Sequence, residues 1–170
     1  MKEMSLFDKI FSWVLGFRTP KFVSIKSFKE IYFECVKGCA DCCRMYLVHV
    51  PEKGLQEKLK DNLITKVDGK KVITRGDDGY CPLLKNKRCS IHEYKPLACQ
   101  GYPFSIDPLT EEVYVDTRCR GIGKGRLLPE DEMDKMISCR KEYWSLRGLS
   151  DAEKEDIHKD FFMKSVKQIK

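Results

Sequence analysis

The sequence lacks an apolar run long enough to cross a membrane. No segment reaches the roughly 18 to 20 consecutive apolar residues that a membrane-spanning helix requires. The apolar N-terminus also contains Glu3, Asp8 and Lys9, whereas a secretory signal peptide has a basic start followed by an uninterrupted apolar stretch. We therefore expect a cytoplasmic protein with no transmembrane segment.

The motifs of nucleotide-binding and hydrolytic enzymes are also missing. The sequence has no glycine-rich nucleotide fingerprint, no Ser/His/Asp set and no evident general base beside its cysteines. The stretch GIGKG at 121–125 matches neither a P-loop nor a Rossmann motif. These absences favour a binding protein and count against an enzyme.

Sequence features of nucleic-acid binding are equally scarce. There is no C2H2 zinc-finger spacing, no RNP-like aromatic motif and no arginine-rich arm. The 32 basic and 26 acidic residues give a net charge of +6, which is spread along the chain without a long basic run. A mild charge of this kind is typical of a solvated surface, so nucleic acid is an unfavoured partner. An RNA-associated, zinc-ribbon-like role is the weakest of the functions we considered.

The composition of the sequence is that of a folded protein with many cysteines. Of the 170 residues, 42% are hydrophobic and 34% are charged, which is a globular composition. There are nine cysteines, and clustered thiols in a reducing compartment more often hold metal than form disulfides. The odd number agrees with metal binding, because a disulfide framework would leave one thiol unpaired.

We predict an α+β fold with a small, irregular, cysteine-rich metal-binding core, short β-hairpins, an N-terminal amphipathic helix and two C-terminal helices. The expected organisation is a helix at 1–20, a metal-binding domain at 21–126 and a helical segment packing on it at 127–170. Apolar residues recur at helical spacing over 4–17, and Pro20 ends this helix. We expect its apolar face to pack on the protein's own core; the alternatives are a protein partner or a membrane surface.

Turn residues and apolar spacing predict the other elements. Asp68-Gly69 suits a type I′ turn and predicts a hairpin of 62–66 with 71–75, whose polar composition places it at the surface. A turn at Asp107-Pro108 predicts a second hairpin. The remaining expectations are strands at 102–106 and 112–117 in that second hairpin, a strand at 47–50, a helix at 52–61, a loop at 118–125, a helix from Pro129 to Gly148, and a last helix begun by a capping box at Ser150 and Glu153.

The strongest pattern is CVKGCADCC, which contains the first cysteine group: Cys35, Cys39, Cys42 and Cys43. Four thiols this close suit zinc or iron, whereas magnesium and calcium prefer oxygen ligands. Adjacent cysteines rarely chelate one ion comfortably, since their side chains tend to point in different directions. One of Cys42 and Cys43 is therefore expected to serve a second metal or a bridge.

A second cysteine group follows, consisting of Cys81, Cys89, Cys99 and Cys119. Seven residues separate Cys81 from Cys89, a spacing that allows a small hairpin to return both thiols to one place. Eight candidate ligands exceed the four of one tetrahedral ion, so two sites, a cluster or some buried thiols must account for the excess. Basic residues flank these cysteines and are expected to offset thiolate charge: Lys85, Lys87, Arg88, Arg118 and Arg120.

Two further residues were weighed as ligands and not favoured. Cys139 lies between Met136 and Tyr143 at helical spacing, which favours burial as a small apolar residue. His92 follows Cys89 by three residues and could ligate a metal, but we favour an ordinary polar role for it. Tyr102, in contrast, is expected to line the metal site together with its neighbours Pro103 and Phe104.

In their order and spacing these pieces resemble the YkgJ-like CxxCxxCC family, domains described as zinc- or iron-chelating that also occur in flagellin lysine N-methylases. The matching pieces are Cys35, Cys39, Cys42, Cys43, Cys81, Cys89 with Ile91, Pro96, Cys99 with Tyr102-Pro103-Phe104, and Cys119 with Gly121. His92 stands where the family usually has Tyr, and Lys95 replaces an Arg, which removes bidentate bonding at that position. The resemblance implies binding of zinc or iron, with a 4Fe-4S cluster as one form. An iron–sulfur redox or methyltransferase-type enzyme is the alternative function.

Overall fold

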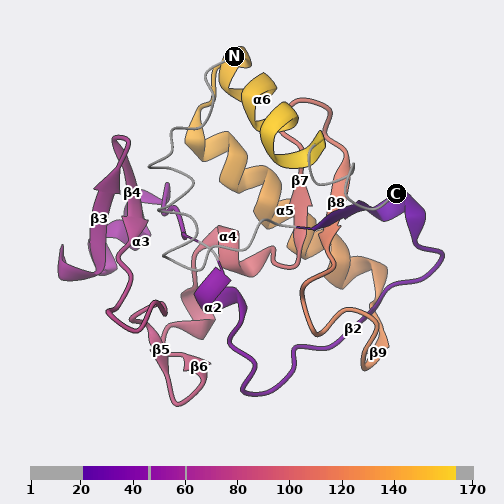
Figure 1. Ribbon diagram of the computed structural model, residues 1–170, viewed down its shortest axis with the longest axis horizontal. Coiled ribbons are helices and arrows are strands. Elements are labelled where there is room, and N and C mark those ends of the chain that lie inside the picture. Colours follow the sequence, from indigo (N-terminus) through magenta and orange to yellow (C-terminus); the bar gives the residue numbers. More distant parts are fainter. Residues whose placement is uncertain (1–20, 46, 60, 164–170) are drawn as a thin grey trace.

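The computed structural model describes residues 21–163, except 46 and 60. Over this part the chain combines helices with small antiparallel sheets, as the predicted α+β class expects (Figure 1). The strands are β1 (Phe22–Ser24), β2 (Tyr32–Phe33), β3 (Ile64–Val67), β4 (Lys70–Ile73), β5 (Leu84–Lys85), β6 (Arg88–Cys89), β7 (Phe104–Ile106), β8 (Val113–Asp116) and β9 (Arg126–Leu127). The helices are α2 (Cys42–Met45), α3 (Lys53–Lys58), α4 (Leu97–Gln100), α5 (Glu130–Arg147) and α6 (Asp151–Ile157), with 3-10 turns at Ile25–Ser27, Asp61–Leu63 and His92–Tyr94 and a π-helical segment at His158–Met163. The amphipathic helix predicted at 4–17 lies outside the described residues.

The largest sheet has three antiparallel strands in the order β1-β8-β7. Its β7–β8 hairpin confirms the second predicted hairpin, with Phe104 opposite Val115. The turn is closed by Asp107, whose carboxylate accepts hydrogen bonds of 2.9 Å from the Leu109 N–H and the Thr110 hydroxyl. Asp favours turns through side-chain bonds of this kind, which is why Asp107 marked the hairpin in the sequence.

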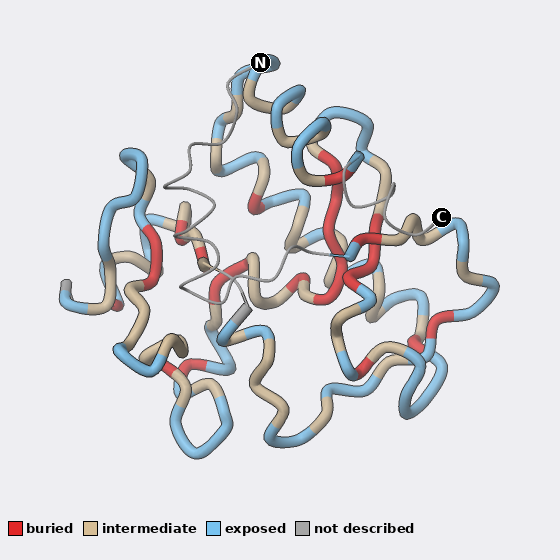
Figure 2. The backbone as a smooth tube through the Cα atoms, viewed as in Figure 1, coloured by how far each residue is buried: buried red, intermediate tan, exposed pale blue. Residues whose placement is uncertain are grey.

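Helix α5 crosses this sheet (Figure 1) and is held to β7 by two side-chain hydrogen bonds. Arg140 Nε donates to the Phe104 carbonyl at 2.7 Å, and Trp144 Nε1 donates to the Ile106 carbonyl at 2.8 Å. Between helix and sheet lies an apolar cluster of Ile31, Phe104, Val115 and Leu128. We call β1, β7, β8 and α5 the sheet-helix half. Burial in it runs along β7 and β8 (Figure 2).

The β3–β4 hairpin confirms the first predicted hairpin. Asp68 and Gly69 have φ values of 49° and 73°, as a type I′ turn requires at both central positions. The prediction of a surface hairpin was wrong for β4, because Val72 and Ile73 are 0% and 3% exposed. Polar composition misled here, since the buried residues of β4 are adjacent and do not alternate along the strand.

The segment 47–50, predicted as a strand, lies along the other edge of β4. It forms a single β-bridge, between His49 and Val72, flanked by hydrogen bonds of Val50 N to Lys71 O and Ile73 N to Val48 O. The strand prediction is therefore met only by this short bridge. The helix predicted at 52–61 is present but shorter, as α3.

Residues 35–101 form what we call the cysteine half, whose interior is an apolar cluster. Its buried members are Val48, Val50, Leu59, Ile73, Leu83 and Ile91. Cys81, Cys89 and Cys99 are partly buried against the edge of this cluster. The sequence predicts a core in which metal-bound cysteines replace apolar packing. The structure describes apolar packing here, so the cysteine ligation stays a prediction.

The C-terminal elements follow their predicted boundaries closely. Pro129 is the N-cap of α5, one position before the first turn where it was expected, and α5 ends before Gly148. The capping box at the start of α6 is confirmed: Ser150 N donates to Glu153 Oε2 at 2.9 Å, and Glu153 N donates to Ser150 Oγ at 3.3 Å. No helix in the described part of the chain is long and apolar enough to cross a membrane.

Candidate metal centre

The first cysteine group lies on a tight loop between β2 and α2. Gly38 has a φ of 72°, a left-handed conformation that costs glycine little, and Ala40 follows at 51°. The loop is closed by Cys39 N donating to Val36 O at 3.1 Å and by Cys43 N donating to Ala40 O at 3.0 Å. Because this loop has no apolar core of its own, Cys35 and Cys42 are exposed as whole residues and Cys39 and Cys43 are half-buried, although the Cys42 sulfur itself is desolvated by its surroundings.

The second group comes from three different places in the chain. Cys89 ends the two-stranded β5–β6 hairpin, which confirms the small hairpin expected between Cys81 and Cys89. Cys99 lies in α4, which packs on α5, and Cys119 lies in the loop after β8. That loop lies so close to residue 34 that a Cβ on Gly121 would be 2.4 Å from the Glu34 carbonyl oxygen.

The two groups meet where Cys81 N donates a 2.9 Å hydrogen bond to the Cys43 carbonyl. Beside this bond, the Arg44 guanidinium lies 5.7 Å from the ring centroid of Tyr80 and donates to its hydroxyl at 3.5 Å. The chain thus joins Cys43 and Arg44 to Tyr80 and Cys81. No residue pattern in the sequence indicates which members of the two groups are neighbours, and this backbone contact answers that question.

The pKa values show that thiols of both groups feel one another's charge, with Cys42 at the centre. A hydrogen bond with the Cys43 thiol, followed by burial, raises the pKa of Cys42 far above its ordinary value. Burial, followed by the charge of Cys42, raises the pKa of Cys35 and raises that of Cys99 to about 12. The same two causes contribute to the raised pKa of Cys81 and Cys119. Cys42 is therefore an electrostatic neighbour of one or more thiols in each of the other cysteine-bearing segments.

The arrangement of these thiols is convergent but open. In the part of the chain that the structure describes, no group of three or more His, Cys, Asp and Glu residues is placed to hold a metal ion. The chemistry of the donor set nevertheless fits zinc or iron, because thiolate is the soft ligand that both metals take in proteins. A cation at this place would also lower the raised thiol pKa values, since metal coordination deprotonates a thiol.

The cations that reach the thiols are mostly not those adjacent to cysteine in the sequence. Lys95, which lowers the pKa of Cys35 and Cys42, and Arg140, which lowers that of Cys99, come from other segments. Lys85, Lys87 and Arg88 are exposed on the β5–β6 hairpin. The hairpin still reaches the first cysteine group, because a Cβ on Gly38 would lie 3.3 Å from the Lys87 Cδ atom, so the expectation that sequence neighbours supply positive charge stays a prediction here.

A further cation near the thiols is Arg75, which the sequence did not single out and which is half-buried. Its Nη1 donates to the Cys43 carbonyl and, at 3.3 Å, to the Gly79 carbonyl. Burial lowers the pKa of Arg75, and the charges of Cys81, Cys43, Cys99 and Cys42 oppose this shift. Arg75 follows β4, and only the β4 register and the loop after it bring the side chain to the cysteines.

Arg118 and Arg120, both expected to offset thiolate charge, are engaged with carboxylates. Arg120 forms a two-pronged ion pair with Asp41, at 2.7 and 2.9 Å, on the loop that carries Cys39. Arg118 donates to the fully buried Asp116 at 3.1 Å. These pairs fix the loops on which cysteines lie, and Arg120 also forms a side-chain hydrogen bond with Cys39, as its expected role beside the thiolates requires.

Tyr102 was expected to line the site, and the structure places it against Cys119. Its hydroxyl lies 3.3 Å from Asp116 Oδ2, and a hydrogen bond from Tyr102 to the Cys119 thiol opposes the rise in that pKa caused by burial. His92 is exposed on a 3-10 turn. Cys139 is half-buried, with its Sγ 3.7 Å from Gln100 Oε1.

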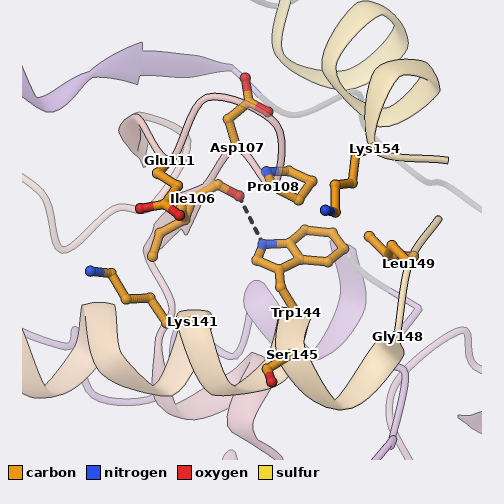
Figure 3. Close-up of a pocket in the computed structure, with 10 residues that line it drawn as sticks. All are labelled: Ile106, Asp107, Pro108, Glu111, Lys141, Trp144, Ser145, Gly148, Leu149 and Lys154. Carbon is orange, nitrogen blue, oxygen red and sulfur yellow. Dashed lines mark hydrogen bonds between the residues drawn. The ribbon is translucent and has the colours of Figure 1, made fainter. Parts of the chain in front are cut away.

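Two of the cavities in the described structure differ in whether they border a thiol. The one in Figure 3, of about 360 Å³, lies between the β7–β8 turn and the end of α5, with Trp144, Lys141 and Lys154 in its wall and no cysteine. The other, of about 370 Å³, is bounded by Cys35, Glu34, Arg126, Glu132, Phe33, Leu128 and Met136. Only this second cavity touches a candidate ligand.

Comparison with known proteins adds a family and one relative. Residues 34–121, just over half of the chain, match the CxxCxxCC family, which is described as "Putative zinc- or iron-chelating domain". The chain is also similar to an uncharacterized protein of Methanocaldococcus jannaschii, with 29% identity over 160 residues, covering 79% of this chain and 55% of the relative. The chain thus spans about half the length of that relative. No solved structure matches the chain. Because the family match extends over most of the described residues and includes all eight cysteines of the two groups, the chain belongs to the CxxCxxCC family.

Proposed function

We propose that the protein is a chelating domain that binds zinc or iron through the thiolates of its two cysteine groups. The ligands in this proposal are Cys35, Cys39, Cys42, Cys43, Cys81, Cys89, Cys99 and Cys119. The observation that carries it is the convergence of both groups on Cys42, which is an electrostatic neighbour of Cys35, Cys81, Cys99 and Cys119. Membership of a family described as chelating supports the same conclusion.

The raised thiol pKa values supply a physical reason for a bound cation. Thiols that bury one another resist ionisation, because each thiolate would be desolvated and repelled by its neighbours. A metal ion reverses both effects by offering positive charge at the centre of the group. Gathering several thiols around Cys42 is thus unfavourable for charged sulfur alone and favourable for a metal–thiolate centre.

The number of thiols argues for more than one conventional zinc site. One tetrahedral ion takes four ligands, and a 4Fe-4S cluster also takes four thiolates, so eight cysteines suffice for two centres. The two adjacent thiols of Cys42 and Cys43 are hydrogen-bonded to each other, so the proposal of separate roles rests on the number of ligands and not on divergent side chains. We propose that one of the two completes the centre and the other bridges to a second metal.

One observation favours an alternative, an iron–sulfur redox or methyltransferase-type enzyme. The cavity of about 370 Å³ opens directly on Cys35, so a small substrate would have space beside the proposed metal. Its charged wall, Glu34, Glu132 and Arg126, includes an ion pair of 2.6 Å between the last two. The chelating function remains our first proposal, since no residue beside this cavity forms a recognised acid–base or nucleophile pair.

Anaerobic purification followed by zinc, iron and acid-labile sulfide analysis tests the proposal. We expect stoichiometric zinc or iron in the wild-type protein, loss of metal in Cys42→Ala, and retention in Cys139→Ala, the matched control outside the two groups. Sulfide with a brown colour would identify a cluster, and a colourless zinc protein would identify zinc. A folded wild-type protein that holds neither metal after anaerobic loading would refute the function.

The cellular setting belongs to the same proposal. Thiols must stay reduced to ligate metal, which favours the cytoplasm for a protein with nine free cysteines. We assign metal binding to residues 21–126 and a supporting role to the helices of 127–170. For the N-terminal segment 1–20 we keep packing on the protein's own core as the first proposal and contact with a protein partner as the alternative.

A further inference from the structure

One side of the first cysteine group borders the cavity of about 370 Å³. Cys35, which is exposed, lies in the wall of this cavity beside Glu34. The rest of the wall comes from β2, from β9 and the residue after it, and from the first half of α5: Phe33, Arg126, Leu128, Glu132 and Met136. Six water molecules occupy roughly 180 Å³, so the cavity has room for a divalent ion that still carries its water.

The charges in this wall leave one carboxylate without a partner. Arg126 Nη2 donates to both carboxylate oxygens of Glu132, at 2.6 and 2.7 Å, so these two charges offset each other. Within the residues that the structure describes, the Glu34 carboxylate forms no hydrogen bond or ion pair. The two carboxylates and one guanidinium give the wall a net charge of −1. A negative wall of this kind attracts cations, and here it lies beside a thiol.

The glycine-rich stretch at 121–125 holds Glu34 at this place. Glu34 N donates to the Gly121 carbonyl at 3.2 Å. A Cβ on Gly125, whose φ is 73°, would lie 2.3 Å from the Glu34 Cβ and 2.5 Å from its Oε2. Glycine alone permits so close an approach at such a φ. The stretch matches no nucleotide-binding motif, and its glycines instead form a packing surface for Glu34 on the loop that carries Cys119.

We propose that the Glu34 carboxylate is the capture group for incoming metal: it attracts a hydrated divalent cation, Zn²⁺ or Fe²⁺, into the cavity and delivers it to the Cys35 thiol. This inference rests on the proposed chelating function and adds the entry route to it. A carboxylate suits the first contact because its charge attracts a hydrated ion, whereas soft thiolates are preferred as final ligands. When the metal–sulfur bond forms, the thiol proton is released to water.

Stopped-flow mixing of metal-free protein with Zn²⁺, followed with a fluorescent zinc indicator, tests this route. We expect Glu34→Gln to slow association roughly 3- to 10-fold at low ionic strength. Arg126→Gln should speed it by a similar factor, because this substitution leaves the charge of Glu132 unpaired. Glu30→Gln is the matched control: it changes the net charge equally, at an exposed position outside the cavity wall, and should leave the rate unchanged. High salt should remove most of these differences, since it screens exposed charges.

The equilibrium affinity of the same proteins, measured by competition with a chromogenic chelator, separates this inference from the proposed function. A wild type that binds no zinc would refute the chelating function and the entry route with it. Equally fast association in wild type and Glu34→Gln would overturn the entry route alone. Unchanged association with faster dissociation in Glu34→Gln would make Glu34 a resident ligand, which also contradicts the proposal. Should Glu34→Gln fail to fold, association in Arg126→Gln that is no faster than in wild type is the contradicting result.

Discussion

The sheet-helix half and the cysteine half of this molecule are ordered in different ways. In the first, Phe104 and Val115 are completely buried between the sheet and α5. In the second, the cysteine loop before α2 is held by tight turns and by hydrogen bonds between backbone groups, with Cys35 and Cys42 exposed. Each half has an apolar cluster of its own, and the difference lies in the cysteine loop, which is outside both clusters and leaves Cys35 exposed.

Metal removal should produce the largest effect, and it should be confined to the cysteine half. Structural zinc contributes about 10 to 16 kcal/mol to the folding of small metal domains, whereas the sheet-helix half has its own apolar core. We expect chelation to increase hydrogen exchange at the amides of Cys39, Cys43 and Cys81 by orders of magnitude, with little change in β7 and β8. Hydrogen exchange measured by mass spectrometry checks this. Equal loss of protection in both halves would mean that the comparison is wrong.

The next largest effect should come from the apolar core of the sheet-helix half. Phe104→Ala removes a ring that is 0% exposed and is expected to lower the free energy of unfolding by about 3 to 5 kcal/mol. Leu146→Ala, at a position that is 49% exposed on α5, is the matched control and should change it by less than about 0.5 kcal/mol. Denaturant titrations at fixed metal content measure both values. A small loss in Phe104→Ala would show that metal, and not this core, holds the sheet-helix half together.

A pH dependence should arise where the two halves meet, at His49. Burial, then the positive charges of Arg147 and Lys70, lower the pKa of His49 to about 4, against about 6.5 in the unfolded chain. Because the folded pKa is the lower one, the unfolded state binds more protons between these values, and stability falls as pH drops from about 6.5 to 4. The full loss is on the order of 3 kcal/mol.

Comparison of wild type with His49→Gln in the same metal state isolates this contribution. Denaturant titrations at pH 7 and pH 4.5 should show a smaller acid-induced loss in the variant, since glutamine does not titrate. An identical loss in the two proteins would assign the acid sensitivity to other groups, such as the cysteine thiolates.

The smallest predicted effect lies at the start of α6. Ser150→Ala removes the capping box with Glu153 and should cost about 1 kcal/mol, the usual value for a lost N-cap. Ser138→Ala, at an exposed position within α5, is the control and should be neutral or slightly stabilising, because alanine has the higher helix propensity. Thermal unfolding of the two variants measures the difference. Equal shifts of the melting temperature in both would mean that the capping box does not stabilise α6 specifically.

Local features of the fold could be predicted from the sequence because single residues determine them. Asp68-Gly69, Asp107 and the Ser150 capping box each mark a turn or helix start through their own backbone preferences. The surroundings of the thiols could not be predicted in the same way. Arg75 and Lys95 reach the cysteines only because β4 and α4 fold next to α2, and a neighbour in space leaves no pattern in one sequence. For the same reason, the sequence does not show which of the three basic residues beside Cys89 face the thiols.

The candidate ligands themselves could be predicted, since their spacing is chemical information that does not depend on the fold. Their grouping could not: the contact between Cys43 and Cys81 depends on the loop that follows Arg75. The 3-10 and π-helical segments, including the burial of Phe162 against Phe22 and Tyr114, were also beyond reach. Such segments are decided by packing and not by local propensity.

X-ray absorption at the zinc or iron edge of the anaerobically purified protein tests the central claim most directly. The account predicts that sulfur dominates the nearest ligands, at the distance of about 2.3 Å expected for metal–thiolate bonds, and that this sulfur signal falls in Cys42→Ala but not in Cys139→Ala. A metal surrounded by oxygen and nitrogen, or a sulfur signal that Cys42→Ala leaves unchanged, would contradict a centre built by the two cysteine groups.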